Sequence, residues 1–192
     1  MTDLPHPAPP YPLSGKRRRL PEDGTLEVFV TDEQNAEPVD VARWGRLAER
    51  VLGAEGIRGA AELSILFIDE TAMGELNLRF MGHDGPTDVL AFPIDDDLVQ
   101  PGRWPDNGSN RPIDPNRDEP VDVPLMLGDV VVCPAVAARN APTHAGNYED
   151  ELALLVVHGI LHVLGMDHAD PAEEATMQAK ERLLLDRFHF ER

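Results

Sequence analysis

The sequence predicts an α+β fold in which a four-stranded mixed sheet packs against about five helices, with a three-histidine metal site on a buried helix. Two patterns predict these layers. Some short segments have the apolar pattern of strands, and longer segments have apolar residues at helical spacing. The length of 192 residues and the hydrophobic content of 42% are sufficient for one core and too high for a wholly disordered chain.

Four segments have the pattern of strands. The first, at residues 26–30, begins with alternating apolar and polar residues. The last, MLGDVVVC at residues 126–133, is mostly apolar, which is typical of a strand in the middle of a sheet. The other two strands are expected at residues 63–68 and 87–92, and Pro93 ends the second of these.

Five segments are expected to be helices. The first follows Asp40, has apolar residues at helical spacing and ends at Gly53. Pro134 stands where a proline favours the first turn of a helix. The segment at residues 148–164 is almost continuously apolar, so this helix is expected to be buried on most sides. The helices are expected at residues 41–53, 69–80, 134–140, 148–164 and 172–187.

Two segments fall outside this pattern. Residues 1–24 hold a proline-rich stretch and the basic run at residues 16–19, and they are expected to form a disordered arm. Residues 95–124 contain six prolines and eight acidic residues against three arginines, which is typical of an irregular insertion. We therefore expect residues 25–192 to form a single domain that is interrupted once.

The chain is strongly acidic, with 35 Asp and Glu against 17 Lys and Arg and a formal net charge of −18. This charge argues against a protein that binds duplex DNA by neutralising phosphates, and against docking on an anionic membrane. The N-terminus lacks the apolar region of a secretory signal, and no apolar segment is long enough to span a bilayer, so we expect a soluble cytoplasmic protein. Cys133 is the only cysteine, which excludes an intrachain disulfide and a cysteine-rich zinc module.

The residues that indicate chemistry lie in HGILHVLGMDH, at residues 158–168. His158 and His162 are four residues apart on the apolar helix, so their rings lie on one face with Cβ atoms about 5–6 Å apart. Gly165 is expected to end the helix in the left-handed conformation, which lets the chain return His168 to the same metal ion. The alternative is a set of core histidines, each of which needs its own buried polar partner.

Three neutral imidazoles leave one position of a tetrahedral Zn²⁺ open, and an open position is typical of a catalytic metal. Zinc lowers the pKa of bound water to about 7, so hydrolysis is the expected chemistry, although imidazole also binds nickel, copper or iron. Metzincin proteases share this spacing, but their general base is a Glu directly after the first His. Gly159 occupies that position here, which argues against a peptidase.

The histidine segment HGxLHxxGxDH is preceded by GPTDVLAFP at residues 85–93 and by LGDVVVC at residues 127–133. In this order the three blocks resemble the bacterial endoribonuclease YbeY family of ribosomal-RNA maturation factors. The resemblance covers about residues 26–187 and leaves out the arm and the insertion.

The resemblance implies an α+β sandwich with a four-stranded sheet, and one zinc ion bound by His158, His162 and His168. It also implies a metal-dependent, single-strand-specific endoribonuclease that acts in 16S rRNA 3′-end maturation and in ribosome quality control.

One position departs from the family pattern. Family members typically carry an aromatic residue followed by arginine upstream of PTDVL, and here these positions are Phe80 and Met81. Arg79 is the nearest guanidinium, and in a helix it lies on a different face. Arg79 and Asp88 are the candidate catalytic residues. Asp88 is expected to orient a ligating histidine, to accept a proton from metal-bound water, or to be a turn residue that bonds its own backbone. Asp129 is open to a role beside a metal ligand or in a structural bond to the neighbouring loop.

The expected function is that of a zinc-dependent endoribonuclease acting on single-stranded ribosomal RNA. Because the net charge predicts weak nonspecific affinity for RNA, the ribosome or small-subunit assembly proteins are expected to present the substrate, and neither DNA nor a membrane is an expected partner. Two alternatives stay open: a metal-dependent hydrolase of another substrate, such as a peptide or a phosphoester, and a non-catalytic, zinc-stabilised ribosome-assembly factor. Met81 at the arginine position favours the assembly factor.

Overall fold

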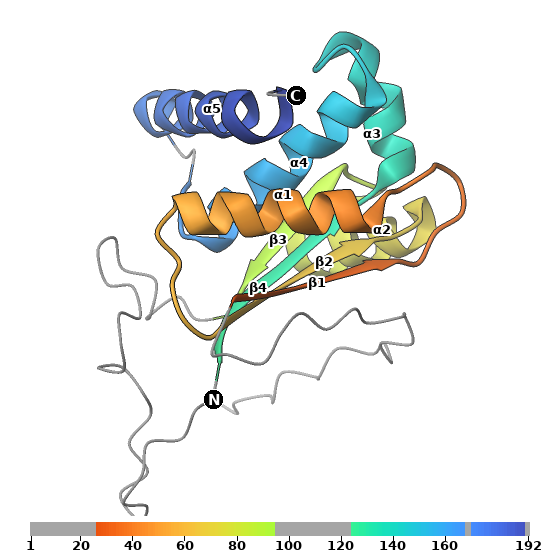
Figure 1. The fold of residues 1–192 in the computed structure, drawn as a ribbon. Coiled ribbons are helices and arrows are strands. Elements are labelled where there is room, and N and C mark those ends of the chain that lie inside the picture. The colour runs from red at the N-terminus through yellow and green to blue at the C-terminus, as the bar shows by residue number, and fades with distance from the viewer. Residues whose placement is uncertain (1–25, 95–123, 168–169, 191–192) are drawn as a thin grey trace, which may run out of the picture.

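The computed structural model describes residues 26–94, 124–167 and 170–190 (Figure 1). Within these ranges, four strands and five α-helices confirm the predicted α+β class. The arm predicted at residues 1–24 and residues 95–123 of the predicted insertion lie outside the described residues. In chain order the elements are β1 Leu26–Asp32, α1 Val41–Ala54, β2 Ala61–Phe67, α2 Glu70–Leu76, the π-helical turn η1 Asn77–Met81, β3 Val89–Pro93, β4 Leu125–Val132, α3 Pro134–Asn140, the 3₁₀ turn η2 Ala141–Thr143, α4 Tyr148–Val163, α5 Pro171–Leu185 and the π-helical turn η3 Asp186–Phe190.

The strands form one mixed sheet with the order β1-β2-β4-β3. The first three of these run parallel to one another, and β3 runs antiparallel to β4. β4 therefore lies inside the sheet, as its apolar sequence predicts, and β3 lies at an edge of the described sheet.

A bulge in β4 brings β3 unusually close. The register between β2 and β4 shifts after Glu62, so that Leu63 pairs with Gly128. Gly128 has a φ of 147°, and a Cβ atom at this position would lie 2.3 Å from the carbonyl oxygen of Phe92. Only glycine allows this approach, which fixes the course of β3 along β4.

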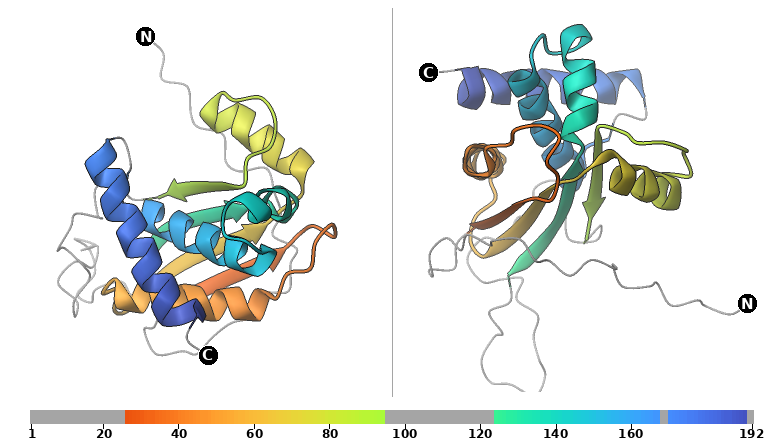
Figure 2. Two further views of the ribbon diagram at one scale, coloured as in Figure 1. Left: turned by 90° about the horizontal axis from the view of Figure 1, so that it is seen from above. Right: turned by 90° about the vertical axis from the view of Figure 1, so that its right-hand side faces the viewer.

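Helices cover both faces of the sheet (Figure 2). α1 and α4 pack against one face, and α5 lies across the outer side of α4. α2 packs on the other face near the β3 edge, where Met73 meets Leu90 and Val131 in a second apolar cluster. None of the helices in the described part of the chain has the length and apolar content needed to cross a bilayer.

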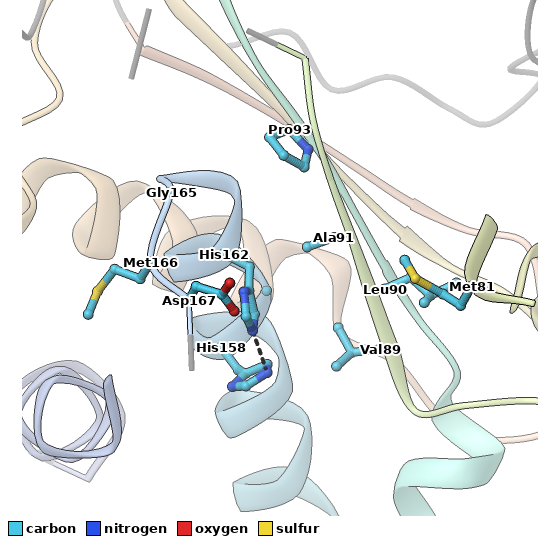
Figure 3. A pocket seen from close by; sticks show the side chains of 11 residues that line it. Met81, Val89, Leu90, Ala91, Pro93, His158, His162, Gly165, Met166 and Asp167 are labelled. Atoms are coloured by element: carbon cyan, nitrogen blue, oxygen red, sulfur yellow. Dashed lines mark hydrogen bonds between the residues drawn. The ribbon is translucent and has the colours of Figure 1, made fainter. Parts of the chain in front are cut away.

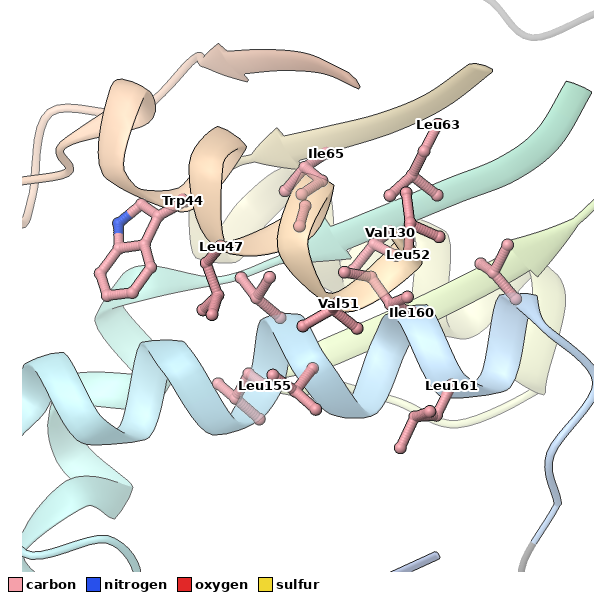
Figure 4. Close-up of a cluster of buried hydrophobic side chains, with 14 of the residues drawn as sticks. Trp44, Leu47, Val51, Leu52, Leu63, Ile65, Val130, Leu155, Ile160 and Leu161 are labelled. Carbon is pink, nitrogen blue, oxygen red and sulfur yellow. The ribbon is translucent and has the colours of Figure 1, made fainter. Parts of the chain in front are cut away.

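The main core lies between α1, α4 and the sheet (Figure 4). Each large apolar side chain buried here stabilises the fold by about 1.5–3 kcal/mol. The cluster therefore holds α4, the helix with the histidines, firmly against the sheet. Its labelled members include Trp44, Leu47, Val51 and Leu52 from α1, Leu63 and Ile65 from β2, Val130 from β4, and Leu155, Ile160 and Leu161 from α4.

Gly159 is the point of closest approach between α4 and the sheet. A Cβ atom on Gly159 would lie 2.4 Å from Cγ1 of Val130, far inside van der Waals contact. This contact sets the rotation of α4, because the side of the helix at residue 159 must face β4. It also excludes a glutamate at this position, which agrees with the sequence argument against a peptidase.

Both ends of α4 are capped. At the start, the side chain of Asn147 accepts a hydrogen bond from the backbone N–H of Asp150, and acidic residues in the first turn favour the helix dipole. At the end, Gly165 has a φ of 83°, its N–H donates to the carbonyl of His162, and the N–H of Met166 donates to the carbonyl of Leu161. These two bonds are a Schellman motif, so the predicted glycine end of the helix is confirmed.

The helix predicted at residues 69–80 differs from the structure at its end. The α-helix stops at Leu76, and residues 77–81 form the π-helical turn η1. Asn77 is buried and its side-chain amide donates to the carbonyl of Gly85 at 2.8 Å, which ties the wider turn to the following loop. As a result, Phe80 is 52% exposed instead of continuing the apolar face of the helix.

We expect Gly159→Ala to lower the free energy of unfolding by about 1–3 kcal/mol, because the new methyl group overpacks against Val130. Gly53→Ala near the end of α1 is the matched control, since nothing lies within 4 Å of a Cβ atom there. This control is expected to be neutral or to stabilise by up to about 1 kcal/mol. Urea unfolding measures the free energy of unfolding of both variants. Equal stability of the two variants would contradict the close approach of residue 159 to Val130.

Candidate active site

His158 and His162 form the centre of the site. They lie one turn apart on α4, with ring centroids 4.6 Å apart and ring planes at 73°. Their Nε2 atoms face each other at 3.1 Å (Figure 3). The i, i+4 spacing therefore brings two ring nitrogens close enough to face one common position, on the side of α4 next to the face that packs on the sheet.

The separation of these nitrogens suits two ligands of one metal ion. Two nitrogens bound to zinc at tetrahedral angles are about 3.3 Å apart, close to the 3.1 Å between the two Nε2 atoms. The third predicted ligand, His168, lies outside the described residues. Among the residues that are described, no group of three or more His, Cys, Asp or Glu side chains could hold a metal ion. The described part of the chain thus supplies two of the three predicted ligands.

A buried carboxylate contacts the other ring nitrogen of His158. Oε1 of Glu181, on α5, lies 2.7 Å from Nδ1 of His158, and Glu181 is only 8% exposed. Glu181 was not among the residues predicted from the sequence. The available signal was its position between Met177 and Leu184, which are both buried, so that an acidic residue occupies the core-facing stripe of an amphipathic helix.

The histidines open into a cleft of about 480 Å³. One wall is β3, whose Val89, Ala91 and Pro93 line the cleft opposite α4 (Figure 3). The turn after α4 contributes Asp167, which lies beside His162 in the same view. The site is therefore a mostly apolar cleft with two imidazoles and one carboxyl group, a composition typical of a small-ligand or substrate site.

The departure from the family pattern is visible at the rim of the cleft. Met81 is among the lining residues, whereas Arg79 is not. The guanidinium of Arg79 lies 5.2 Å from the centre of the Phe80 ring, and Phe80 in turn packs edge-on against Phe92 at 5.0 Å. Arg79 thus lies on an aromatic pair beside the cleft and does not take the place of the missing arginine within its lining.

Asp88 is held by protein donors. Its Oδ1 accepts from the backbone N–H of Val89 at 2.9 Å and from the hydroxyl of Thr87, and its Oδ2 accepts from the side-chain amide of Asn140 at 3.2 Å. It is absent from the lining of the cleft. These bonds tie the start of β3 to α3 and favour the turn role, while the catalytic role of Asp88 stays a prediction.

Asp129 lies on the opposite face of the sheet from the histidines. It precedes Val130, which faces α4, so the alternation along β4 directs Asp129 to the other side. Burial raises the pKa of its carboxyl group, and a hydrogen bond from Ser64, its partner on β2, opposes the rise. Of its two expected roles, the structure supports the structural bond, here to the neighbouring strand.

We expect Asp129→Asn to unfold at a higher urea concentration than the parent at pH 7, because the desolvated carboxylate is replaced by a neutral amide that still accepts from Ser64. A carboxyl group whose pKa is raised on folding stabilises the protein only when protonated. The difference between the two proteins should therefore shrink as the pH falls through the raised pKa toward 3.8, the ordinary value. A difference that grows on acidification would contradict this account.

Comparisons with known proteins identify the family of the chain. A model of the family described as "Endoribonuclease YbeY" matches residues 29–189. A protein named endoribonuclease YbeY from Beutenbergia cavernae is 45% identical over 157 residues, covering 81% of this chain and 94% of the relative. Proteins of the same name from Salinispora tropica and Frankia casuarinae are 43% and 42% identical over 160 residues, covering 83% of this chain and 94% and 73% of the relatives, respectively.

Among solved structures, the solution structure of TM1509 from Thermotoga maritima is similar with 22% identity and a TM-score of 0.48, covering 84% of this chain and 90% of that one. The family match spans almost all of the described residues, and the relatives exceed 40% identity over most of their own length. The chain belongs to the endoribonuclease YbeY family.

Proposed function

We propose that this protein is a zinc-dependent endoribonuclease that cleaves single-stranded RNA during maturation of the 3′ end of 16S rRNA and in ribosome quality control. The observation that carries the proposal is the pair of Nε2 atoms 3.1 Å apart, on two histidines that line an open cleft. Membership of an endoribonuclease family supplies the reaction class. The cytoplasm, where ribosomes are assembled, is the proposed location.

His158 and His162 fit a zinc ion by their donor type and by the separation of their nitrogens, and His168 is the proposed third ligand. Zinc bound there acts as a Lewis acid that offsets charge on the phosphodiester and makes water a stronger acid. In the protein, α4 holds the two imidazoles in fixed positions, and β3 forms the opposite side of the cleft. Asp167, which lines the cleft beside His162, is the residue that we propose orients water or a ribose hydroxyl.

The rim of the cleft supports a single-stranded substrate. Unpaired bases stack on aromatic rings and on arginine planes, and each stacked base contributes about 1–3 kcal/mol. Phe80 exposes half of its surface next to Met81, and Arg79 lies over its ring. A duplex hides its base faces, so such a surface favours RNA whose bases are unpaired.

The charge of the chain supports delivery of the substrate by a partner. The net charge of −18 repels free RNA, and described arginines such as Arg43 and Arg139 are paired with Glu149 and Glu70. We propose that the ribosome or small-subunit assembly proteins present the single-stranded ribosomal RNA to the cleft.

A non-catalytic, zinc-stabilised assembly factor is the second candidate. The observation that favours it is Met81, which lines the cleft where the family pattern has arginine. Methionine offers no charged donor to a phosphate group, so a cleft of this kind binds RNA without the full electrostatic stabilisation of a cleavage reaction. A peptidase on the metzincin template is disfavoured, because it needs a glutamate at residue 159 as its general base. A side chain at this position would collide with Val130.

We expect the purified protein to hold about one zinc ion per chain, and His158→Ala to lose both the metal and RNA cleavage, because the remaining ligands cannot close the site. Metal analysis and cleavage of a 16S rRNA 3′-end precursor measure the two effects. His144→Gln, in the turn before the N-terminus of α4, is the control and should keep both zinc binding and RNA cleavage. A His158→Ala protein that cleaves like its parent would contradict the mechanism.

We expect Met81→Arg to raise cleavage of the same precursor about tenfold, because a guanidinium at the rim can donate charged hydrogen bonds to a phosphate worth about 1.4 kcal/mol or more. Met81 is 45% exposed, so the longer side chain can be accommodated. Met81→Leu is the uncharged control and should behave like the parent. If neither the parent nor Met81→Arg cleaves the precursor while both bind zinc, the assembly-factor role is supported instead.

A further inference from the structure

We propose that Glu181 is a positioning residue that fixes the tautomer and the orientation of the His158 ring, so that its Nε2 lone pair faces the metal position. This inference rests on the metal role proposed for His158. It concerns a residue on α5 that lies 23 positions from the histidine in sequence and outside all three sequence blocks of the family resemblance.

The carboxyl group of Glu181 is buried beside His158. Glu181 is one of the few charged residues buried in the described part of the chain, and its side chain is only 10% exposed. A buried carboxylate is costly unless a donor compensates it. The described residues give it one hydrogen-bond partner, Nδ1 of His158 at 2.7 Å. The hydrogen bond to the imidazole therefore compensates the burial of this carboxylate.

The contact between Glu181 and His158 also selects one tautomer of the ring. An ionised carboxylate only accepts hydrogen bonds, so Nδ1 of His158 must carry the proton. In the neutral ring, Nε2 is then the unprotonated nitrogen, and it is this atom that lies 3.1 Å from Nε2 of His162. Only this tautomer presents a lone pair to a metal ion at that point.

The helix that carries Glu181 is held in place by contacts on both sides of this residue. Met177 and Leu184, one turn before and after Glu181 on α5, are buried in the main core. Lys180, the preceding residue, forms an ion pair with Glu55 after the end of α1, at 2.7 Å. α5 is thus fixed on both sides of Glu181, and the carboxylate acts from a scaffold that does not depend on the metal.

The test compares Glu181→Gln with Lys180→Ala. Glutamine has the volume of glutamate, but its amide can donate as well as accept, so it no longer dictates which ring nitrogen carries the proton. Lys180→Ala removes the neighbouring ion pair of α5 and leaves the carboxylate in place. A change caused only by weaker docking of α5 would appear in both variants.

The first measurement is zinc affinity, by competition with a chromophoric chelator. We expect affinity to fall about 10- to 100-fold in Glu181→Gln and to stay at the parental value in Lys180→Ala. The second is a long-range ¹H–¹⁵N spectrum of the histidine rings in metal-free protein, with His158 assigned by comparison with His158→Gln. The parent and Lys180→Ala should show His158 protonated at Nδ1, and Glu181→Gln should show a mixture of tautomers.

A Glu181→Gln protein with parental zinc affinity and an unchanged His158 tautomer would overturn the proposal. Equal losses of affinity in both variants would also overturn it, because the effect would then come from the packing of α5. The ring spectrum needs neither zinc nor RNA. A parent that fails to cleave RNA would therefore contradict the proposed function, while the role of Glu181 would still be decided by the tautomer of His158.

Discussion

The contact between Gly159 and Val130 determines how the rest of the site is arranged. It brings the backbone of α4 against β4 without a side chain between them, and so sets the rotation of the helix. With residue 159 facing the sheet, His158 and His162 must lie on the adjoining side, toward β3 and the cleft. Gly128 acts in the same way on β3, whose carbonyl at Phe92 approaches so closely that no Cβ atom fits. Two glycines thus place both walls of the cleft.

Two polar groups of the site come from outside the contact between α4 and the sheet: one from α5 and one from the turn after α4. α5 crosses α4 and brings Glu181 to the back of the His158 ring, while the Schellman turn at Gly165 directs the chain past His162 with Asp167 in the cleft. A carboxylate that accepts a hydrogen bond from an imidazole fixes the tautomer and the orientation of the ring, and a metal ligand needs both. This contact accounts for the presence of an acidic residue in the core-facing stripe of α5.

The sequence was sufficient to predict the four strands, the central place of β4 and the glycine end of α4, because each depends on local patterns of apolar residues, proline and glycine. The expected mixed sheet is confirmed as well. It also predicted that His158 and His162 share a face. The π-helical turn at residues 77–81 was not predicted, because it depends on the bond from Asn77 to Gly85 across a loop. Glu181 was missed for a similar reason: its partner belongs to another helix, and the pairing becomes visible only when α5 is packed on α4.

The central claim is that the histidine cleft carries out metal-dependent cleavage of RNA. The most direct measurement is cleavage of a 16S rRNA 3′-end precursor by the parent protein as purified, after removal of metal with a chelator, and after zinc is restored. The account predicts cleavage in the single-stranded region by the first sample, none by the second, and recovery in the third. Cleavage that persists at the same rate in fully chelated protein would contradict it.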